Sequence, residues 1–134
     1  MLYFICAESA HEWYSVGEHI YKIGYSVYGG ANRLSVLQIG NPVKLRLDFE
    51  VEGDRETEKL VHEYLSDYRV NGEWFRANAD NIRYFDYLLM FFDDAYHSAD
   101  NLEGVPAAIN ENMKFLIKLK KYDLAIKRRE EEGK

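Results

Sequence analysis

The sequence predicts an α+β protein with a small three-stranded antiparallel sheet flanked by helices, followed by a C-terminal two-helix extension. Residues 43–51 carry the clearest strand pattern, because apolar and charged side chains alternate along them with the period of a strand. Three later segments instead repeat apolar residues at helical spacing. Together these two periodicities define the fold class.

Two apolar runs near the amino terminus, over residues 2–6 and 19–23, predict the first and second strands. A glycine pair then precedes a short helix, which ends at Gly40 and Pro42. The alternation of residues 43–51 leaves one apolar face and one charged face, so we expect this third strand to be buried on one side only.

The next helix is predicted over residues 55–68, and Asp54 is placed to accept the free backbone N–H groups of its first turn. Its buried stripe consists of Leu60, Val61, Tyr64, Leu65 and Tyr68. Residues 72–75, with the sequence GEWF, follow this helix. We expect Trp74 and Phe75 to dock back on the core.

Two further helices complete the chain. Apolar side chains recur at helical spacing from about residue 80 to residue 96, and again over residues 107–130 after a break at Pro106. We therefore expect residues 1–78 to form one domain. Residues 79–134 would form a helical extension that packs on this domain or on a partner.

Composition and charge narrow the function classes. The chain has 134 residues, 47% hydrophobic and 30% charged, which is ordinary for a soluble globular protein. No apolar run is long enough for a signal peptide or a membrane span, so we expect a cytoplasmic protein.

Charge is unevenly distributed along the chain. The first 108 residues carry 9 Lys+Arg against 18 Asp+Glu, and the remaining residues carry 8 Lys+Arg against 5 Asp+Glu. This balance counts against an extended nucleic-acid surface but permits a few local cations.

Glu58 and His62 lie one helical turn apart at the border of the buried stripe. A carboxylate there is partly desolvated and still reachable, which suits a hard ion such as Mg²⁺. Taken alone, however, the spacing is better explained by a surface glutamate with a histidine partner. Arg33 likewise has two interpretations: its guanidinium either binds a phosphate or is a solvated side chain on the helix surface.

The order of the motifs is more specific than any one of them. Between Leu2 and Phe75 the chain presents LYFI, YKIG, Arg33, LQIGNP, EGDRETEKLVHEYL and VNGEWF. In this order they resemble the GIY-YIG endonuclease superfamily. Within it the chain is similar to the branch that is named for a meiotically up-regulated gene and shared with phage proteins.

The resemblance implies hydrolysis of phosphodiester bonds in nucleic acid, with DNA as the expected substrate and one divalent ion, Mg²⁺ or Mn²⁺. It also implies the three-stranded sheet already expected. Tyr3 matches the tyrosine of the first motif, Arg33 the arginine that steadies the attacked phosphate, and Glu58 the single metal-binding glutamate.

Lys22 and Tyr25 depart from the usual pattern. In much of the superfamily a tyrosine precedes the Ile-Gly pair and a lysine often follows three positions later, whereas here the two residue types are exchanged. We hypothesise that Lys22 points into the site, where it holds a neighbouring tyrosine toward phenolate or contacts the phosphate. Leu37 stands where related nucleases often carry a tyrosine or histidine, and His62 is the candidate to replace that group.

Three interpretations follow. The first is a metal-dependent endonuclease. The second is a nucleic-acid-binding module that keeps the fold without turnover, which Leu37 and the acidic balance favour. The third is a protein-interaction domain that works through its terminal helices. Aromatic residues surround the first of these helices, which favours burial on two sides, under the last helix or in a homodimer.

Overall fold

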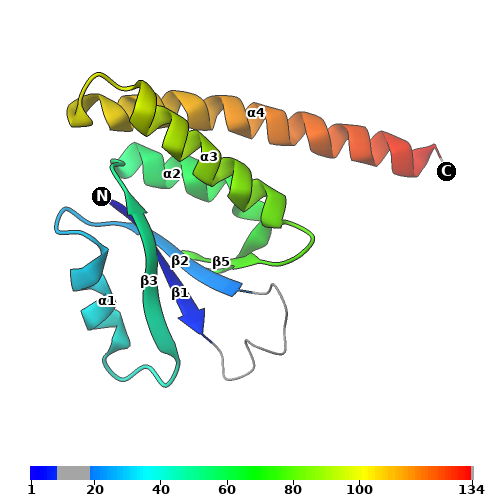
Figure 1. Cartoon of the computed structure of the whole chain (residues 1–134). Coiled ribbons are helices and arrows are strands. Elements are labelled where there is room, and N and C mark those ends of the chain that lie inside the picture. The colour runs from blue at the N-terminus through cyan, green and yellow to red at the C-terminus, as the bar shows by residue number, and fades with distance from the viewer. Residues whose placement is uncertain (9–18, 134) are drawn as a thin grey trace.

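The computed structural model describes residues 1–8 and 19–133, and Figure 1 shows how their elements are arranged. In chain order the elements are β1 (Leu2–Glu8), β2 (His19–Tyr25), α1 (Gly30–Gln38), β3 (Lys44–Val51), α2 (Arg55–Tyr64), η1 (Ser66–Tyr68), β4 (Arg69–Asn71), β5 (Trp74–Ala77), α3 (Ile82–Ser98), η2 (Leu102–Gly104) and α4 (Val105–Glu132). Helix α1 lies on one face of the sheet, and α2, α3 and α4 cover the other. Among the helices described here, none is both long enough and apolar enough to cross a membrane.

The α+β class is confirmed, but the prediction of a three-stranded sheet was wrong. Five strands form one antiparallel sheet in the order β3-β1-β2-β5-β4. The two additional strands, β4 and β5, form a hairpin whose turn consists of Gly72 and Glu73. Gly72 has a φ of 51°, in the left-handed region that favours glycine. Trp74 and Phe75, expected only to dock on the core, belong to β5 and pair with β2.

Strand β1 lies between β2 and β3, and its side chains alternate between two apolar clusters. The α1 cluster consists of Tyr3, Ile5 and Leu45, with Leu34, Leu37, Leu47 and Trp74 packed against it. The main cluster joins the opposite face of the sheet to α2, α3 and α4, and includes Leu2, Phe4, Ile23, Val61, Tyr64, Leu88 and Met113. Because Tyr3 pairs with Gly24 and Ile5 with Lys22, these four residues share the face covered by α1, hereafter the α1 face.

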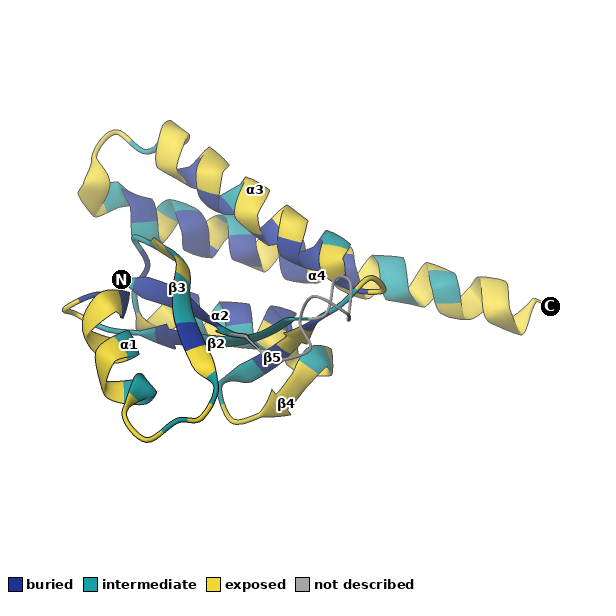
Figure 2. Cartoon of the chain, turned by 60° about the horizontal axis from the view of Figure 1, so that its bottom comes forward, coloured by how far each residue is buried: buried dark blue, intermediate teal, exposed yellow. Residues whose placement is uncertain are grey.

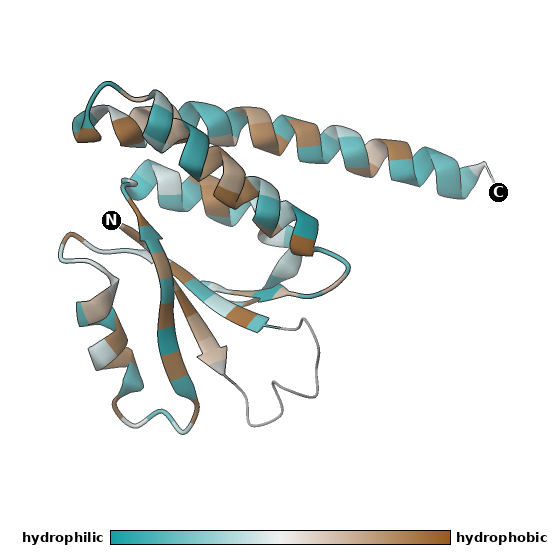
Figure 3. Ribbon diagram, viewed as in Figure 1, coloured by the Kyte–Doolittle hydropathy of each residue, from teal (hydrophilic) through white to brown (hydrophobic). Residues whose placement is uncertain are grey.

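Helices α3 and α4 pack over the main cluster rather than standing apart from the sheet. Figure 2 shows buried residues along the facing sides of both helices, and the carboxyl-terminal part of α4 projecting beyond α3 as a largely exposed rod. Apolar residues nevertheless continue into this projecting part, as Figure 3 shows. The projecting helix therefore carries apolar side chains that the chain itself leaves uncovered.

Candidate functional site

Tyr3 lies on the α1 face, and two glycines make room for it. A Cβ on its register partner Gly24 would collide with the Tyr3 hydroxyl, so only glycine leaves space for the phenol ring. A Cβ on Gly30 would lie 2.8 Å from the Tyr3 Cβ and 2.6 Å from Leu47 Cδ1. Glycine at this position thus lets α1 approach the sheet closely and brings Arg33, one turn later, to the Tyr3 hydroxyl.

The start of α1 is held by a side chain of β3. The Gly30 N–H donates a hydrogen bond of 2.9 Å to the Glu50 carboxylate. Gly29 precedes it with a φ of 89°, which a residue with a side chain rarely adopts. An anionic acceptor also stabilises the positive end of the helix dipole. The position of Arg33 is therefore set by the backbone at the start of its own helix.

Lys22 extends from the α1 face, and its charge is matched within the protein. Its Nζ lies 3.0 Å from the Glu73 carboxylate and 5.7 Å from the centroid of the Trp74 ring, and its side chain is only 11% exposed. The Glu73 carbonyl also accepts the Ile23 N–H at 3.0 Å. Sequence analysis missed Glu73, although its place directly after the Asn-Gly turn signal pointed to a hairpin.

Burial raises the pKa of Tyr3. The Arg33 guanidinium beside the hydroxyl lowers this pKa, whereas the charges of Glu73 and Glu58 raise it further. Tyr3 is therefore a neutral phenol near pH 7, able to donate a hydrogen bond. This opposes the hypothesis that Lys22 holds Tyr3 toward phenolate. Of these three residues, Arg33 hydrogen-bonds the hydroxyl, whereas Glu73 and Glu58 act on it through their charges alone.

Glu58 lies on α2, which packs beside the end of β2. Strand β5 pairs with residues 19–22 of β2, the Glu73 carbonyl accepts the Ile23 N–H, and α2 contacts the same edge at the Ile23 carbonyl. His62 Nε2 donates to the Ile23 carbonyl at 2.7 Å, which orients α2 against this edge. Glu58, one helical turn before His62, lines a hollow of about 450 Å³. Its lining residues are Glu58, Lys59, His62, Glu63, Ser66 and Arg69.

The Glu58 carboxylate fits the requirements of a single divalent ion. Within the described residues it accepts no hydrogen bond and forms no ion pair. No group of three or more His, Cys, Asp or Glu side chains in that same part of the chain could enclose a metal. Mg²⁺ is commonly held by one or two carboxylates and keeps several waters, with substrate phosphate completing its shell. An accessible lone glutamate suits this mode of binding.

Tyr25 does not join the other candidates. It pairs with Leu2, whose side chain lies in the main cluster, so the pleat directs Tyr25 to the face opposite Lys22. There the Arg55 guanidinium lies 5.0 Å from the centroid of its ring. Leu37 packs in the α1 cluster. Of the six predicted site residues, Tyr3, Lys22 and Arg33 thus share one face, Glu58 and His62 line the adjacent edge, and Tyr25 is separate.

Comparison with known proteins finds one family. The model described as the T5orf172 domain matches residues 1–85, which include every candidate site residue and end within α3. No curated protein and no solved structure matches the chain.

Proposed function

The chain belongs to the T5orf172 domain family, which is associated with nucleases, and on this premise we propose that it is a metal-dependent endonuclease acting on DNA. One observation carries the proposal. A phenol, a guanidinium and an ammonium share the α1 face of the sheet, and a carboxylate that accepts no hydrogen bond within the described residues lies on α2 beside β2. This combination of cations and one accessible carboxylate suits a scissile phosphate and its ion.

Arg33 and Tyr3 would bind the phosphate. The exposed Arg33 guanidinium can donate two parallel hydrogen bonds to phosphate oxygens, which fixes their orientation as well as their charge. The neutral Tyr3 hydroxyl beside it can donate a third. Lys22 adds a positive charge whose position Glu73 and Trp74 determine. Arg33 and Lys22 would thus supply positive charge at the site, although the chain as a whole carries a net charge of −6.

Glu58 would hold the ion and His62 would accept the proton of the attacking water. A bound Mg²⁺ or Mn²⁺ would neutralise the charge that develops on the leaving oxygen. The His62 ring donates from Nε2 to the Ile23 carbonyl, so the neutral ring keeps Nδ1 as its acceptor. His62 lines the same hollow as Glu58, which favours it over the buried Tyr3 as the proton acceptor.

Glu58→Gln tests this proposal directly. Purified protein is incubated with plasmid, single-stranded DNA and RNA, with and without Mg²⁺ or Mn²⁺, and cleavage is followed on gels. We expect metal-dependent cleavage that falls by about 100-fold or more in Glu58→Gln, because the ligand charge is lost. Glu56→Gln changes an exposed glutamate of the same helix and should leave the rate unchanged. Equal rates for the wild type and Glu58→Gln would reject the assignment.

One observation favours a second candidate, a nucleic-acid-binding module without turnover. Leu37 is occupied in apolar packing, so α1 offers no proton-transfer group one turn after Arg33. Salt-dependent binding without cleavage on any substrate, weakened by Arg33→Ala, would select this function over the endonuclease.

A further inference from the structure

Helix α4 carries an apolar stripe that the rest of the chain leaves uncovered. Phe115, Leu119, Tyr122 and Ile126 are 55%, 43%, 67% and 37% exposed. Their spacings of four, three and four residues are those of the a and d positions of a heptad. Such spacing keeps all four side chains on one line along a straight helix, where a second helix can pack against them.

Helix α3 widens the stripe into a groove. Tyr87 and Met90 are exposed beside it, and the rings of Phe91 and Phe115 lie 6.3 Å apart. The groove between the two helices has a volume of about 500 Å³ and mainly apolar walls. This mainly apolar lining favours the apolar face of a helix over a small polar ligand.

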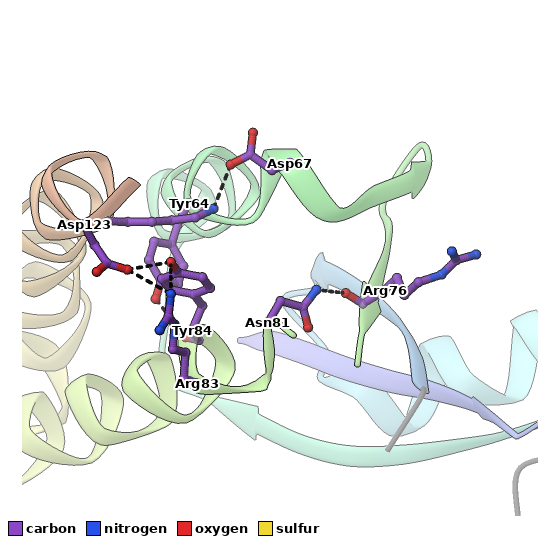
Figure 4. Close-up of polar contacts among 8 residues, drawn as sticks. Tyr64, Asp67, Arg76, Asn81, Arg83, Tyr84 and Asp123 are labelled. Atoms are coloured by element: carbon purple, nitrogen blue, oxygen red, sulfur yellow. Dashed lines mark hydrogen bonds and ion pairs between the residues drawn. The ribbon is translucent and has the colours of Figure 1, made fainter. Parts of the chain in front are cut away.

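Contacts beside the stripe, along the same groove, hold α4 against α3 and prevent the stripe from turning inward. The Asp123 carboxylate accepts hydrogen bonds from the Tyr84 hydroxyl at 2.7 Å and from Arg83 at 3.1 Å, and Figure 4 shows these three side chains gathered between α3 and α4. Lys120 is buried among the rings of Tyr64, Tyr68 and Tyr84. The rotation of α4 is therefore fixed with the stripe facing outward.

We propose that α4 is a dimerisation helix, which packs antiparallel against α4 of a second copy of this chain and lies in its α3–α4 groove. This inference does not rest on the proposed nuclease activity. It commits to a second copy because the stripe is complementary to itself. With the two-fold axis between residues 120 and 121, Phe115 lies opposite Ile126 of the partner subunit and Leu119 opposite Tyr122 of the partner subunit.

The charges at the ends of the stripe agree with the same register. The next layer outward brings Arg129 opposite Asn112 of the partner subunit, next to the adjoining Glu111 of the partner subunit, and symmetry repeats this arrangement at the other end. The Arg129 and Glu111 side chains are both exposed in the single chain. A parallel pairing would instead place the two copies of Arg129 against each other, and like charges oppose association. Charge therefore favours the antiparallel arrangement.

Sedimentation velocity over a range of protein concentrations measures the oligomeric state. We expect the 15.8-kDa chain to form a reversible dimer, and Leu119→Glu to raise the dissociation constant by at least about 10-fold. Leu102→Glu is the matched control, because Leu102 is 58% exposed on η2, away from the stripe, and should leave the dimer unchanged. Circular dichroism checks that both variants fold. A wild-type monomer at every concentration, or equal effects of the two variants, would overturn the proposal.

Disulfide trapping tests the register. In the antiparallel arrangement, residue 119 lies opposite residue 122 of the partner subunit, within the short Cα separation that a disulfide requires. Oxidation of a mixture of Leu119→Cys and Tyr122→Cys proteins should give a covalent dimer, whereas either protein alone should give little. The native Cys6 thiol is buried and should not interfere. Efficient cross-linking of each single variant with itself would show a parallel dimer and refute the arrangement.

Discussion

At the scale of single residues, Lys22 shows how the fold controls a charge at the candidate site. Its side chain is largely buried, and the Glu73 carboxylate at 3.0 Å matches its ammonium group. This ion pair reduces the net positive potential that a phosphate would meet. Glu73 also helps to raise the pKa of Tyr3. Under the proposed function, the affinity of the site for phosphate would therefore depend on the Glu73 carboxylate.

Glu73→Gln should strengthen nucleic-acid binding. Removing one negative charge next to Lys22 should lower the dissociation constant for a short DNA duplex by about 5-fold at low salt, the effect of about 1 kcal/mol. Fluorescence anisotropy without divalent ions measures binding in the absence of cleavage. Glu103→Gln removes an equal charge from an exposed position on η2 and serves as the control. Equal affinities for wild type and Glu73→Gln would show that the ion pair lies outside the phosphate site.

The candidate site could be predicted residue by residue only in part. The order of the motifs indicated Tyr3, Arg33 and Glu58; in the structure Arg33 hydrogen-bonds the Tyr3 hydroxyl, and Glu58 lines a hollow on α2. Strand parity alone separates Lys22 from Tyr25, because residues three apart on a strand point to opposite faces. Exchanging the two residue types therefore still leaves the lysine and the tyrosine on opposite faces of β2. The role of Glu73 depended on a hairpin whose pairing partner lies some 50 positions earlier in the sequence.

At the scale of elements, pattern length decided which parts could be predicted. Strand β3 has 8 residues and alternates clearly, whereas β4 has 3 and β5 has 4, too few to establish a period. The only local signal for this hairpin was the Asn-Gly pair, whose asparagine ends β4 and whose glycine begins the turn. Helix α2 was predicted to residue 68, but it ends at Tyr64 and continues as the 3-10 helix η1.

The predicted cap of α2 is confirmed and leads to a test of stability. The Asp54 carboxylate accepts the Thr57 N–H at 2.9 Å and the Asn110 side-chain N–H at 3.2 Å, and the Thr57 hydroxyl accepts the Asp54 N–H in return. We expect Asp54→Ala to lower the free energy of unfolding by about 1–2 kcal/mol, measured by urea denaturation at pH 7. Asp54→Asn keeps a capping oxygen and should lose clearly less. Equal losses would contradict a hydrogen-bonding role.

The same cap gives a pH dependence. Burial would raise the pKa of Asp54, but its hydrogen bonds outweigh burial and hold this pKa below the ordinary value of 3.8. The stabilisation from the carboxylate is therefore complete above pH 3.8 and is lost as the pH falls through the lower pKa of the folded state. The stability difference between wild type and Asp54→Asn should shrink over that interval.

At the scale of the whole molecule, the helical extension supports the helix that carries Glu58. The family match ends at residue 85, yet two residues of α4 hold α2 in place. Asn110 accepts a buried hydrogen bond of 2.6 Å from the Thr57 hydroxyl, and Lys120 donates to the Tyr64 carbonyl. A lysine in a basic helix gives no sequence signal of burial, so this connection could not be predicted. The position of Glu58 thus depends on a part of the chain outside the matched domain.

Lys120→Ala tests this dependence. Lys120 is 6% exposed, its Nζ lies 4.4–5.3 Å from the centroids of three tyrosine rings, and it pairs with Asp67 at 3.2 Å. Truncation removes these cation–π contacts and leaves a cavity, so we expect unfolding to become easier by about 2–4 kcal/mol. The adjacent, exposed Lys121→Ala should change stability by less than about 0.5 kcal/mol. Because α2 loses its support, DNA cleavage by folded Lys120→Ala should also fall, whereas a fully active variant would show that α4 does not position Glu58.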